Sequence, residues 1–306
     1  MSAGSQPFIG IVTVLYNSDE VLPDFFASLA AQTGVCYRLY VIDNGTTDSG
    51  TRMSEQLAAR HGIDAVCVFN DANGGVARGN NQGIERALAD GCTHVLLANN
   101  DTAFGSATIV TLLDAMTLAR EASATPKIMY HDEPELLWYG GGHISRLTGK
   151  SPHYGERERD VGQYDQQMRV GYAPTCFMLV ERSVFAAVGL MDESYFVYSD
   201  DVDFVWRMDK RGLHVLYVPA SVVLHKVSTT TGGARTPFTA YYTNRNRVYF
   251  LRKNFSGVRR AAAIAYMLST RLPRLMALPW NSARRGWRGV YDGFRMPIHS
   301  IRDPRA

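Results

Sequence analysis

Carboxylates stand at several places in this chain where they could bind a cation or activate a hydroxyl. The segment His94–Asp101 runs from an apolar stretch through two amides to the carboxylate of Asp101. Such strand ends are typical of ligand sites in open α/β sheets, because the carboxyl ends of parallel strands share one edge. Oxygen ligands suit Mg²⁺ or Mn²⁺. Asp101 is therefore a candidate metal ligand, and the alternative is a carboxylate that caps the next turn.

A second acidic cluster contains Asp200, Asp201 and Asp203. Carboxylates this close repel one another, and a fold keeps them more readily when a cation, a proton or a substrate compensates the charge. They also precede a predicted helix over Phe204–Lys210, where acids interact favourably with the helix dipole. The dipole accounts for one acid more easily than for three, which favours a functional site.

Two further segments could contact a ligand. His225 ends an apolar strand before a Ser/Thr/Gly-rich stretch at 228–233, so it is either a metal ligand or a structural histidine. Asn73-Gly74-Gly75 opens a predicted helix, where glycines allow close approach and the helix N-terminus favours phosphate. This segment matches neither the P-loop nor the dinucleotide fingerprint, and a simple turn is the alternative.

The elements that would position these residues alternate between strand and helix. Strand, helix, strand in this order predicts βαβ units and a mostly parallel sheet flanked by helices. The predicted strands are Ile9–Asn17, Tyr37–Asn44, Ala65–Asp71 and His94–Asp101, and the predicted helices are Glu20–Gln32, Thr51–His61 and Val76–Ala89.

The pattern changes after Asp101, and residues 126–170 predict an irregular insertion or small hairpins. Periodic segments return on both sides of that region, and Pro273 and Pro279 are expected to break the helix near the end. The predicted helices are Thr108–Ala119, Arg182–Val188 and Ala261–Thr270, and the predicted strands are Cys176–Val180, His214–Val218 and Ser221–Leu224.

Charge is distributed unevenly along the 306 residues. The net charge is +3, but residues 245–306 carry +12 and residues 1–244 carry −9. A basic tail predicts either a polyanionic neighbour, such as an anionic membrane, a lipid-linked diphosphate or nucleic acid, or simply a solvated basic surface. The cysteines lack the CxxC spacing of a zinc site. The chain shows no signal peptide and no apolar run of about 18 residues, which predicts a cytoplasmic protein.

Taken together, these segments resemble the family 2 glycosyltransferases, which have the GT-A fold. The similarity covers roughly residues 8–230, and it comes from the ordered set of motifs because no single one is specific. The matching stretches are Val12–Ser18, Val41–Asp48, Asn73–Gly83, Leu96–Thr102, Phe177–Phe185, Val188–Glu193, Asp200–Asp203 and His225. The rhamnosyltransferase-like branch, which acts on bacterial cell-surface polysaccharides, is the most similar in character.

The resemblance implies a role for each matching residue. Asp43 would recognise the nucleotide base, and Asp101 would be the last acid of the family's DXD motif, with His225 as a second metal ligand. Asp201 would be the general base, with Asp200 at the position of the preceding Glu. The residues implied in nucleotide and ribose binding are Tyr16, Asn17, Asn73, Gly75, Arg78 and Asn100. Asn99 replaces the first acid of the DXD motif, so one carboxylate is lost there.

We therefore expect a GT-A catalytic domain over 1–240, with a nucleotide-sugar half over about 8–105 and an acceptor half over about 106–240. A basic helical extension would follow over 241–306. The implied reaction is metal-dependent, inverting transfer of a sugar, with rhamnose from dTDP-rhamnose as the first candidate, to a cell-surface glycan or lipid-linked acceptor. Alternatives are a UDP-hexose or UDP-galactofuranose donor, or a non-catalytic nucleotide-sugar-binding module.

The extension would either lie on the inner face of the cell membrane or form a helical pair that packs on the domain or makes a homodimer. Its basic residues flank the apolar segment 261–278, and Trp280 and Trp287 follow. That composition suits an interfacial segment. Binding to nucleic acid is not expected, because the tail carries no recognised motif.

Overall fold

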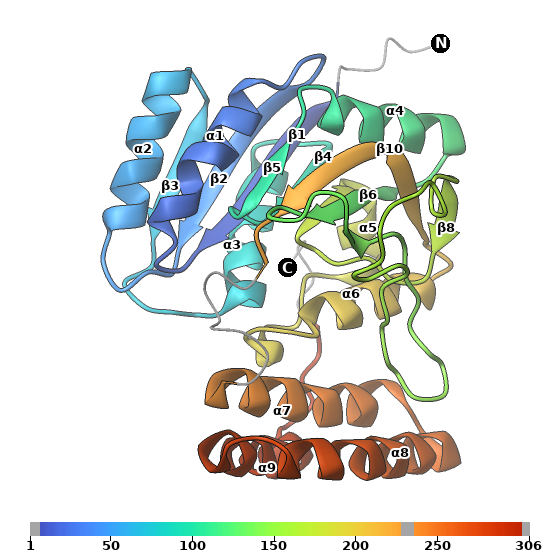
Figure 1. The fold of residues 1–306 in the computed structure, drawn as a ribbon. Helices are drawn as coiled ribbons and strands as arrows, with labels where there is room; N and C mark the ends of the chain where they lie inside the picture. Colours follow the sequence, from blue (N-terminus) through green and yellow to red (C-terminus); the bar gives the residue numbers. More distant parts are fainter. Residues whose placement is uncertain (1–6, 228–235, 302–306) are drawn as a thin grey trace.

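The first half of the chain alternates strand and helix, as the sequence pattern predicts. The structure, a computed structural model, describes residues 7–227 and 236–301, so the stretch 228–233 lies outside it. The strands pair in parallel in the order β3-β2-β1-β4, so their carboxyl ends share one edge of the sheet (Figure 1). The elements are β1 (Phe8–Leu15), α1 (Leu22–Ala30), β2 (Cys36–Asp43), α2 (Ser49–His61), β3 (Ala65–Phe69), α3 (Val76–Ala89) and β4 (His94–Ala98).

The second half extends the same sheet with both parallel and antiparallel pairs. The strand order continues β4-β9-β6-β10-β5, and β9 is antiparallel to both of its neighbours. The α/β class is confirmed, with parallel pairing limited to the first four strands and to β6 with β10. The elements are β5 (Thr102–Phe104), α4 (Thr108–Ala119), β6 (Ser123–Tyr130), β7 (Leu137–Tyr139), β8 (Met168–Val170), β9 (Phe177–Glu181), α5 (Arg182–Val188), α6 (Asp200–Asp209) and β10 (Val215–His225).

The central strand β6 begins just before, and runs into, the region predicted to be irregular. The sequence of β6 does not show the apolar pattern of a buried strand, because the polar residues Thr125 and Lys127 are buried within it. Both have partners: Thr125 donates to the carbonyl of Phe177 at 3.1 Å, and Lys127 pairs with Asp160 at 2.6 Å. Buried polar groups are tolerated when they are paired, so the apolar pattern is a poor guide here.

Two other boundaries differ from the prediction. The segments His214–Val218 and Ser221–Leu224 form one strand, β10, whose register shifts between Val218 and Val222. A bulge of this kind lets a strand continue through an irregular stretch. Helix α6 begins at Asp200 instead of Phe204, so all three clustered acids belong to its first turn.

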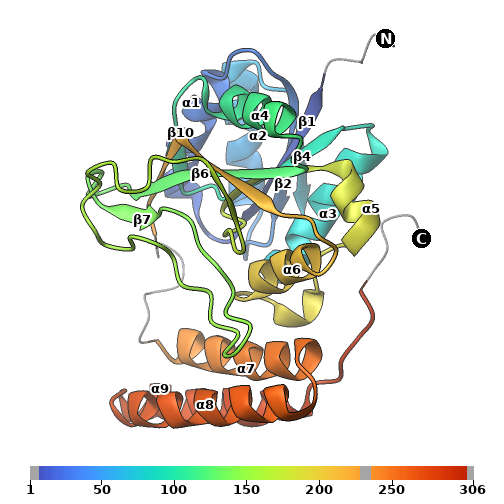
Figure 2. The same cartoon turned by 90° about the vertical axis from the view of Figure 1, so that its right-hand side faces the viewer.

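Three C-terminal helices form a separate layer beneath the sheet and its flanking helices (Figures 1 and 2). They are α7 (Pro237–Asn254), α8 (Gly257–Met276) and α9 (Trp280–Arg295). The prediction that Pro273 breaks the helix is wrong, because Pro273 lies inside the last turn of α8. Proline has a φ compatible with the helix, and here the loss of its backbone donor interrupts the hydrogen-bond pattern only in the final turn.

Helix α9 packs on α7 through small residues and turns its aromatic side chains outward. A Cβ on Gly289 would overlap the carbonyl of Tyr241, and one on Gly293 would lie 2.5 Å from the carbonyl of Arg245. The exposed large residues of this helix are Trp280, Trp287, Tyr291 and Phe294. Among the described residues, no helix has the length and apolarity needed to cross a bilayer.

Candidate active site

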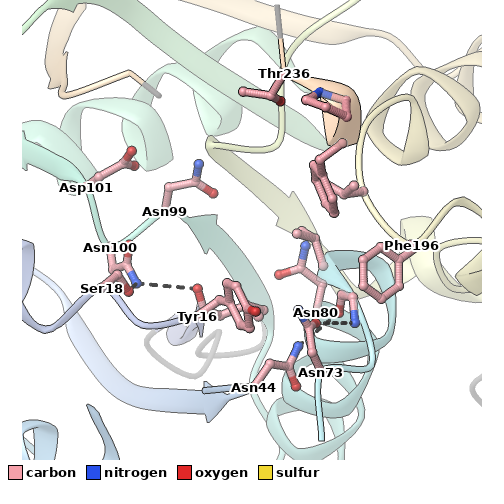
Figure 3. Close-up of a pocket in the computed structure, with 16 residues that line it drawn as sticks. Tyr16, Ser18, Asn44, Asn73, Asn80, Asn99, Asn100, Asp101, Phe196 and Thr236 are labelled. Carbon is pink, nitrogen blue, oxygen red and sulfur yellow. Dashed lines mark hydrogen bonds between the residues drawn. The ribbon is translucent and has the colours of Figure 1, made fainter. Parts of the chain in front are cut away.

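A cavity of about 530 Å³ opens at the carboxyl edge of the first strands (Figure 3). Neutral amides and aromatic rings dominate its wall, a combination that can hydrogen-bond ribose and sugar hydroxyls and cover rings. The lining residues named by the sequence analysis are Tyr16, Asn73, Gly75, Asn99, Asn100 and Asp101, and the others include Ser18, Asn44, Asn80, Phe196 and Phe238. We call this space the donor cavity.

The Asn73–Gly75 turn closes one side of the donor cavity against the segment that carries Phe196. The Asn73 Oδ1 accepts a hydrogen bond from the Gly75 N–H at 2.9 Å, and Gly75 has φ +85°. A Cβ at this position would lie 2.5 Å from the Phe196 carbonyl, which itself accepts from the Val76 N–H at 2.6 Å. Only glycine combines this backbone angle with so close an approach.

Asn100 is held by the strand beside it. Its Nδ2 donates to Ser18 Oγ at 2.8 Å, and the side chain is buried (Figure 3). The amide therefore ties the end of β4 to the turn after β1, which fixes the backbone that carries Asp101.

Asp43, Asn17 and Arg78 do not line the donor cavity. Asp43 and Asn17 line a neighbouring hollow of about 390 Å³. The Asp43 carboxylate accepts from the Gly45 N–H at 2.8 Å, and from Thr51 through its N–H at 2.8 Å and its hydroxyl at 2.9 Å. Arg78 is exposed on α3. These three residues lie beside the donor cavity, and in this structure Asp43 orders the loop before α2.

A second cavity of about 530 Å³ adjoins the first, and we call it the acceptor cavity. Asp101, Asn99, Val76 and Val197 line both cavities. The other residues of interest in its wall are Trp138, Ser151, His153, Tyr172, Asp200, Asp201 and His225. The structure thus brings Asp101, Asp201 and His225 together in one cavity wall, although they are widely separated in the sequence.

The pairing of β5 with β10 explains how His225 reaches Asp101. His225 is the register partner of Thr102, and the Lys226 N–H donates to the Asp101 carbonyl at 2.9 Å. The His225 Nε2 lies 3.2 Å from the Asp101 Oδ1. Burial opposes ionisation of Asp101, but the electrostatic interaction with His225, with smaller contributions from the backbone and Asn99, outweighs it and lowers the pKa of Asp101.

This pair fits a divalent cation better than it fits a closed hydrogen-bonded contact. The Asp101 Oδ1 is buried and accepts no hydrogen bond of good geometry from the described residues, although the His225 Nε2 lies 3.2 Å away. Two ligands about 2.1 Å from a shared octahedral ion lie about 3 Å apart. No group of three His, Cys, Asp or Glu residues in the described part of the chain could hold a metal, so this protein would supply two ligands.

Asp201 presents a carboxylate to the acceptor cavity that other groups hold in place. The Tyr172 hydroxyl donates to its Oδ2 at 2.7 Å, and the Val202 N–H donates to its Oδ1 at 2.7 Å. Burial raises the pKa of Asp201. Burial and the charge of Asp201 also raise the pKa of Asp200. A carboxylate with a raised pKa is a stronger base, which suits proton abstraction near neutral pH.

Asp203 does not line the acceptor cavity. It is fully buried and pairs with Arg207 and Lys253, each at 2.9 Å. Although burial opposes its ionisation, these two cations lower the pKa of Asp203. Lys253 also pairs with Asp192 at 2.7 Å, so the network joins α6 to α7. The acidic cluster therefore divides into two carboxylates that face the acceptor cavity and one that supports the fold.

The aromatic wall of the acceptor cavity was missed by the sequence analysis. The Trp138 ring meets the rings of His225 and His153 edge to face, at centroid distances of 4.7 and 4.6 Å. His153 stacks on Tyr172 at 5.7 Å. Trp138 and His153 come from the region predicted to be irregular, where isolated aromatic residues carry no spacing that marks them.

Comparison with known sequences identifies the family of this chain. A family model described as "Glycosyltransferase like family 2" matches residues 7–250. The chain is 29% identical over 272 residues to the N-acetylglucosaminyl-diphospho-decaprenol L-rhamnosyltransferase of Mycobacterium tuberculosis, covering 82% of this chain and 86% of that protein. It is 25% identical over 252 residues to the dTDP-rhamnosyl transferase RfbF of Shigella flexneri, covering 79% of each.

Solved structures share the fold at low sequence identity. GalNAc-T7, solved with UDP, GalNAc and Mn²⁺, aligns with a TM-score of 0.65 and 15% identity, covering 95% of this chain and 55% of that one. The mannosyltransferase PcManGT from Pyrobaculum calidifontis, solved with GDP-Man and Mn²⁺, aligns with a TM-score of 0.58 and 10% identity, covering 97% and 77%. The chain therefore belongs to the glycosyltransferase-like family 2 and is a glycosyltransferase with the GT-A fold.

Proposed function

We propose that this glycosyltransferase transfers a sugar, with inversion, from a nucleoside diphosphate donor to a hydroxyl of a cell-surface glycan or lipid-linked acceptor. The first candidate donor is dTDP-rhamnose, which the names of the relatives support. The observation that carries the proposal is the place of Asp101, which lines both the donor and the acceptor cavity. A sugar held there would have its leaving group on one side and the attacking hydroxyl on the other.

The residues of the acceptor cavity would perform a single displacement. Asp201 would take the proton of the acceptor hydroxyl while that oxygen bonds to the anomeric carbon. The bond from the anomeric carbon to the diphosphate breaks in the same step, and its electron pair leaves with the nucleoside diphosphate. Attack opposite the leaving group inverts the anomeric configuration. Tyr172 would orient the Asp201 carboxylate through its hydrogen bond of 2.7 Å.

Asp101 and His225 are the residues that would hold Mg²⁺ or Mn²⁺, with oxygens of the diphosphate and water as the other ligands. The buried Asp101 Oδ1, which accepts no hydrogen bond of good geometry from the described residues and lies 3.2 Å from the His225 Nε2, supports this assignment. When bound, the cation supplies Lewis-acid stabilisation of the charge on the leaving diphosphate. Asn99, in place of a second acid, would leave the site with one carboxylate and a stronger dependence on His225.

A thermal-shift panel followed by a turnover assay tests the proposal. The full chain is incubated with dTDP-, UDP- and GDP-sugars, each with and without Mn²⁺, and release of nucleoside diphosphate is then measured for the donor that stabilises most. We expect the largest stabilisation from dTDP-rhamnose with Mn²⁺. Stronger stabilisation by a UDP-hexose or by UDP-galactofuranose would assign that sugar nucleotide as the donor in place of dTDP-rhamnose. Stabilisation with no release or transfer would identify a non-catalytic binding module and refute the proposed reaction.

We also propose that the C-terminal helices lie on the inner face of the cell membrane. Helix α9 exposes Trp280, Trp287, Tyr291 and Phe294 on the side opposite its glycine face, and arginines flank them. Aromatic and basic side chains together favour a membrane interface. Sedimentation with phosphatidylglycerol vesicles, compared with phosphatidylcholine vesicles, tests this. A concentration-dependent dimer with no vesicle binding would instead assign the aromatic face to a homodimer.

A further inference from the structure

Four cations meet where the loop at 145–150 touches the C-terminal helices. The Lys150 Nζ lies 2.8 Å from the Tyr266 hydroxyl of α8, and it also lies over that ring. Arg247 of α7 donates to the backbone carbonyls of Thr148 and Gly149. Two further arginines lie on α8 after Tyr266: Arg274 is eight residues on, so it shares the face of Tyr266, and its Nη1 donates to the Thr270 carbonyl one turn away. Arg271 lies one turn before the end of the same helix, and we call the set Lys150, Arg247, Arg271 and Arg274 the cationic cluster.

The members of the cluster are close enough to influence one another electrostatically. Burial and then the charge of Arg271 lower the pKa of Arg247, and burial and then the charge of Arg274 lower the pKa of Arg271. Lys150, through its hydrogen bond and charge, lowers the pKa of the Tyr266 phenol, with smaller effects from Arg274 and Arg247. Lys150, Arg247 and Arg274 therefore all lie near the phenol of Tyr266, which is exposed.

No carboxylate among the described residues pairs with any of these four cations, as the ion pairs of the described chain show. Lys150 and Arg274 are exposed, and Arg247 and Arg271 are half-buried. Three other cations, by contrast, pair with carboxylates: Lys127 with Asp160, and Arg207 and Lys253 with Asp203. Like charges held together without a counter-charge cost free energy unless an anion is bound between them. An anionic ligand bound among these side chains would remove this repulsion.

The position of the cluster indicates which ligand. Lys150 directly precedes Ser151, which lines the acceptor cavity together with His153 and Asp201. Figures 1 and 2 show a loop of the insertion descending to the C-terminal helix layer, where Arg247 and Tyr266 hold residues 148–150. Arg274 is exposed, so the site is open to solvent. The cluster thus lies between the acceptor cavity and the surface proposed to contact the membrane.

We propose that the cationic cluster binds the diphosphate of a lipid-linked acceptor while the acceptor sugar enters the cavity of Asp201. This inference rests on the proposed function and adds the chemical class of the acceptor. Guanidinium groups bind phosphate oxygens through paired hydrogen bonds, and an ammonium adds a point charge. The lipid chain would then leave along α8 and α9, on the side of the exposed aromatic residues.

Calorimetry with geranyl diphosphate, a short soluble probe, tests this in the full-length protein. EDTA is present throughout, so that the probe cannot bind through a metal at Asp101. The test variant K150Q/R271Q/R274Q keeps Arg247, whose carbonyl contacts hold the loop. The control variant R259Q/R260Q/R284Q removes the same charge from exposed positions of the same helix layer. Melting temperatures establish that both variants are folded.

We expect the test variant to bind geranyl diphosphate about tenfold or more weakly, because charged hydrogen bonds are lost. The control variant should stay within about twofold of the unmodified protein, as expected for screened surface charges, and geraniol should not bind. Equal weakening in both variants, an unchanged test variant, or no binding by the unmodified protein would overturn the proposal.

Two further measurements are needed. One distinguishes an acceptor diphosphate from a lipid headgroup as the ligand of the cluster, and the other distinguishes failure of this inference from failure of the proposed reaction. Loss of phosphatidylglycerol vesicle binding in the test variant, with geranyl diphosphate binding retained, would assign the cluster to lipid headgroups and overturn the inference. Donor hydrolysis without acceptor is measured in the same preparations. Binding of geranyl diphosphate without donor hydrolysis would refute the proposed reaction and leave the cluster assignment standing. Donor hydrolysis without binding of geranyl diphosphate would support the proposed reaction and overturn the cluster assignment.

Discussion

The imidazole of His225 lies with its Nε2 3.2 Å from the Asp101 Oδ1, at the boundary between two cavities. The contact joins Asp101, the residue just before β5, to His225, the residue that ends β10. The short strand β5 makes it possible, because its first residue, Thr102, is the register partner of His225. A carboxylate and an imidazole held this way are suited to share a cation that faces the donor diphosphate.

Replacement of the proposed base should separate binding from chemistry. We expect Asp201→Asn to leave donor affinity nearly unchanged and to lower turnover about 10²–10⁴-fold, the usual contribution of a positioned base. Steady-state kinetics and donor calorimetry measure the two effects. Asp209→Asn, a change near the other end of α6, serves as the control and should keep turnover. Turnover within a few-fold of the unmodified protein in Asp201→Asn would remove Asp201 from this role.

Removal of the proposed metal ligand should act on the donor. We expect Asp101→Ala to weaken nucleotide binding in the presence of Mn²⁺ and to abolish the difference that EDTA makes in the unmodified protein. The physical reason is that the diphosphate would lose the cation that neutralises its charge. Titration calorimetry with and without Mn²⁺ measures this. A metal-dependent affinity that survives the substitution would contradict the assignment.

The two carboxylates of the acceptor cavity should make folding stability pH-dependent. Their folded pKa values are raised, so the unfolded chain loses these protons first as pH rises. Stability therefore falls as pH increases from about 4, the unfolded pKa, through the raised folded values. We expect Asp200→Asn to stabilise the fold by about 1–3 kcal/mol at pH 8, since each pKa unit is worth about 1.4 kcal/mol. The gain should shrink at pH 5. Urea unfolding at pH 5 and at pH 8 measures the gain in stability. An equal gain at the two pH values would contradict a raised pKa of Asp200 in the folded state.

Alanine substitutions at two glycines of α9, Gly289 and Gly286, should have different effects on stability, because only at Gly289 would the added Cβ overlap the backbone of α7. Gly289→Ala would force a Cβ into the backbone carbonyl of Tyr241, whereas Gly286→Ala would meet only the flexible end of Leu275. We expect Gly289→Ala to destabilise by about 1–3 kcal/mol, as overpacking does. Gly286→Ala should be near neutral, because alanine favours the helix by about 1 kcal/mol. Thermal unfolding measures both, and equal effects would show that the helices can move apart.

The sequence by itself was sufficient to predict the α/β architecture of the first half. Apolar strands end there in polar residues, and regular helices such as Val76–Ala89 and Thr108–Ala119 have the boundaries that their spacing predicts. Local periodicity determines these elements, because each strand or helix buries a face defined by neighbouring residues. The ordered motifs likewise identified the family.

Only the tertiary structure decided which residues meet. Strand β6 was hidden by buried polar side chains whose partners lie far along the chain, and β5 is too short to show a period. The aromatic residues around Asp201 and the arginines beside Lys150 come from segments with no common spacing. Their positions depend on strand register and helix packing, which are long-range contacts, and a one-dimensional pattern carries no measure of such contacts.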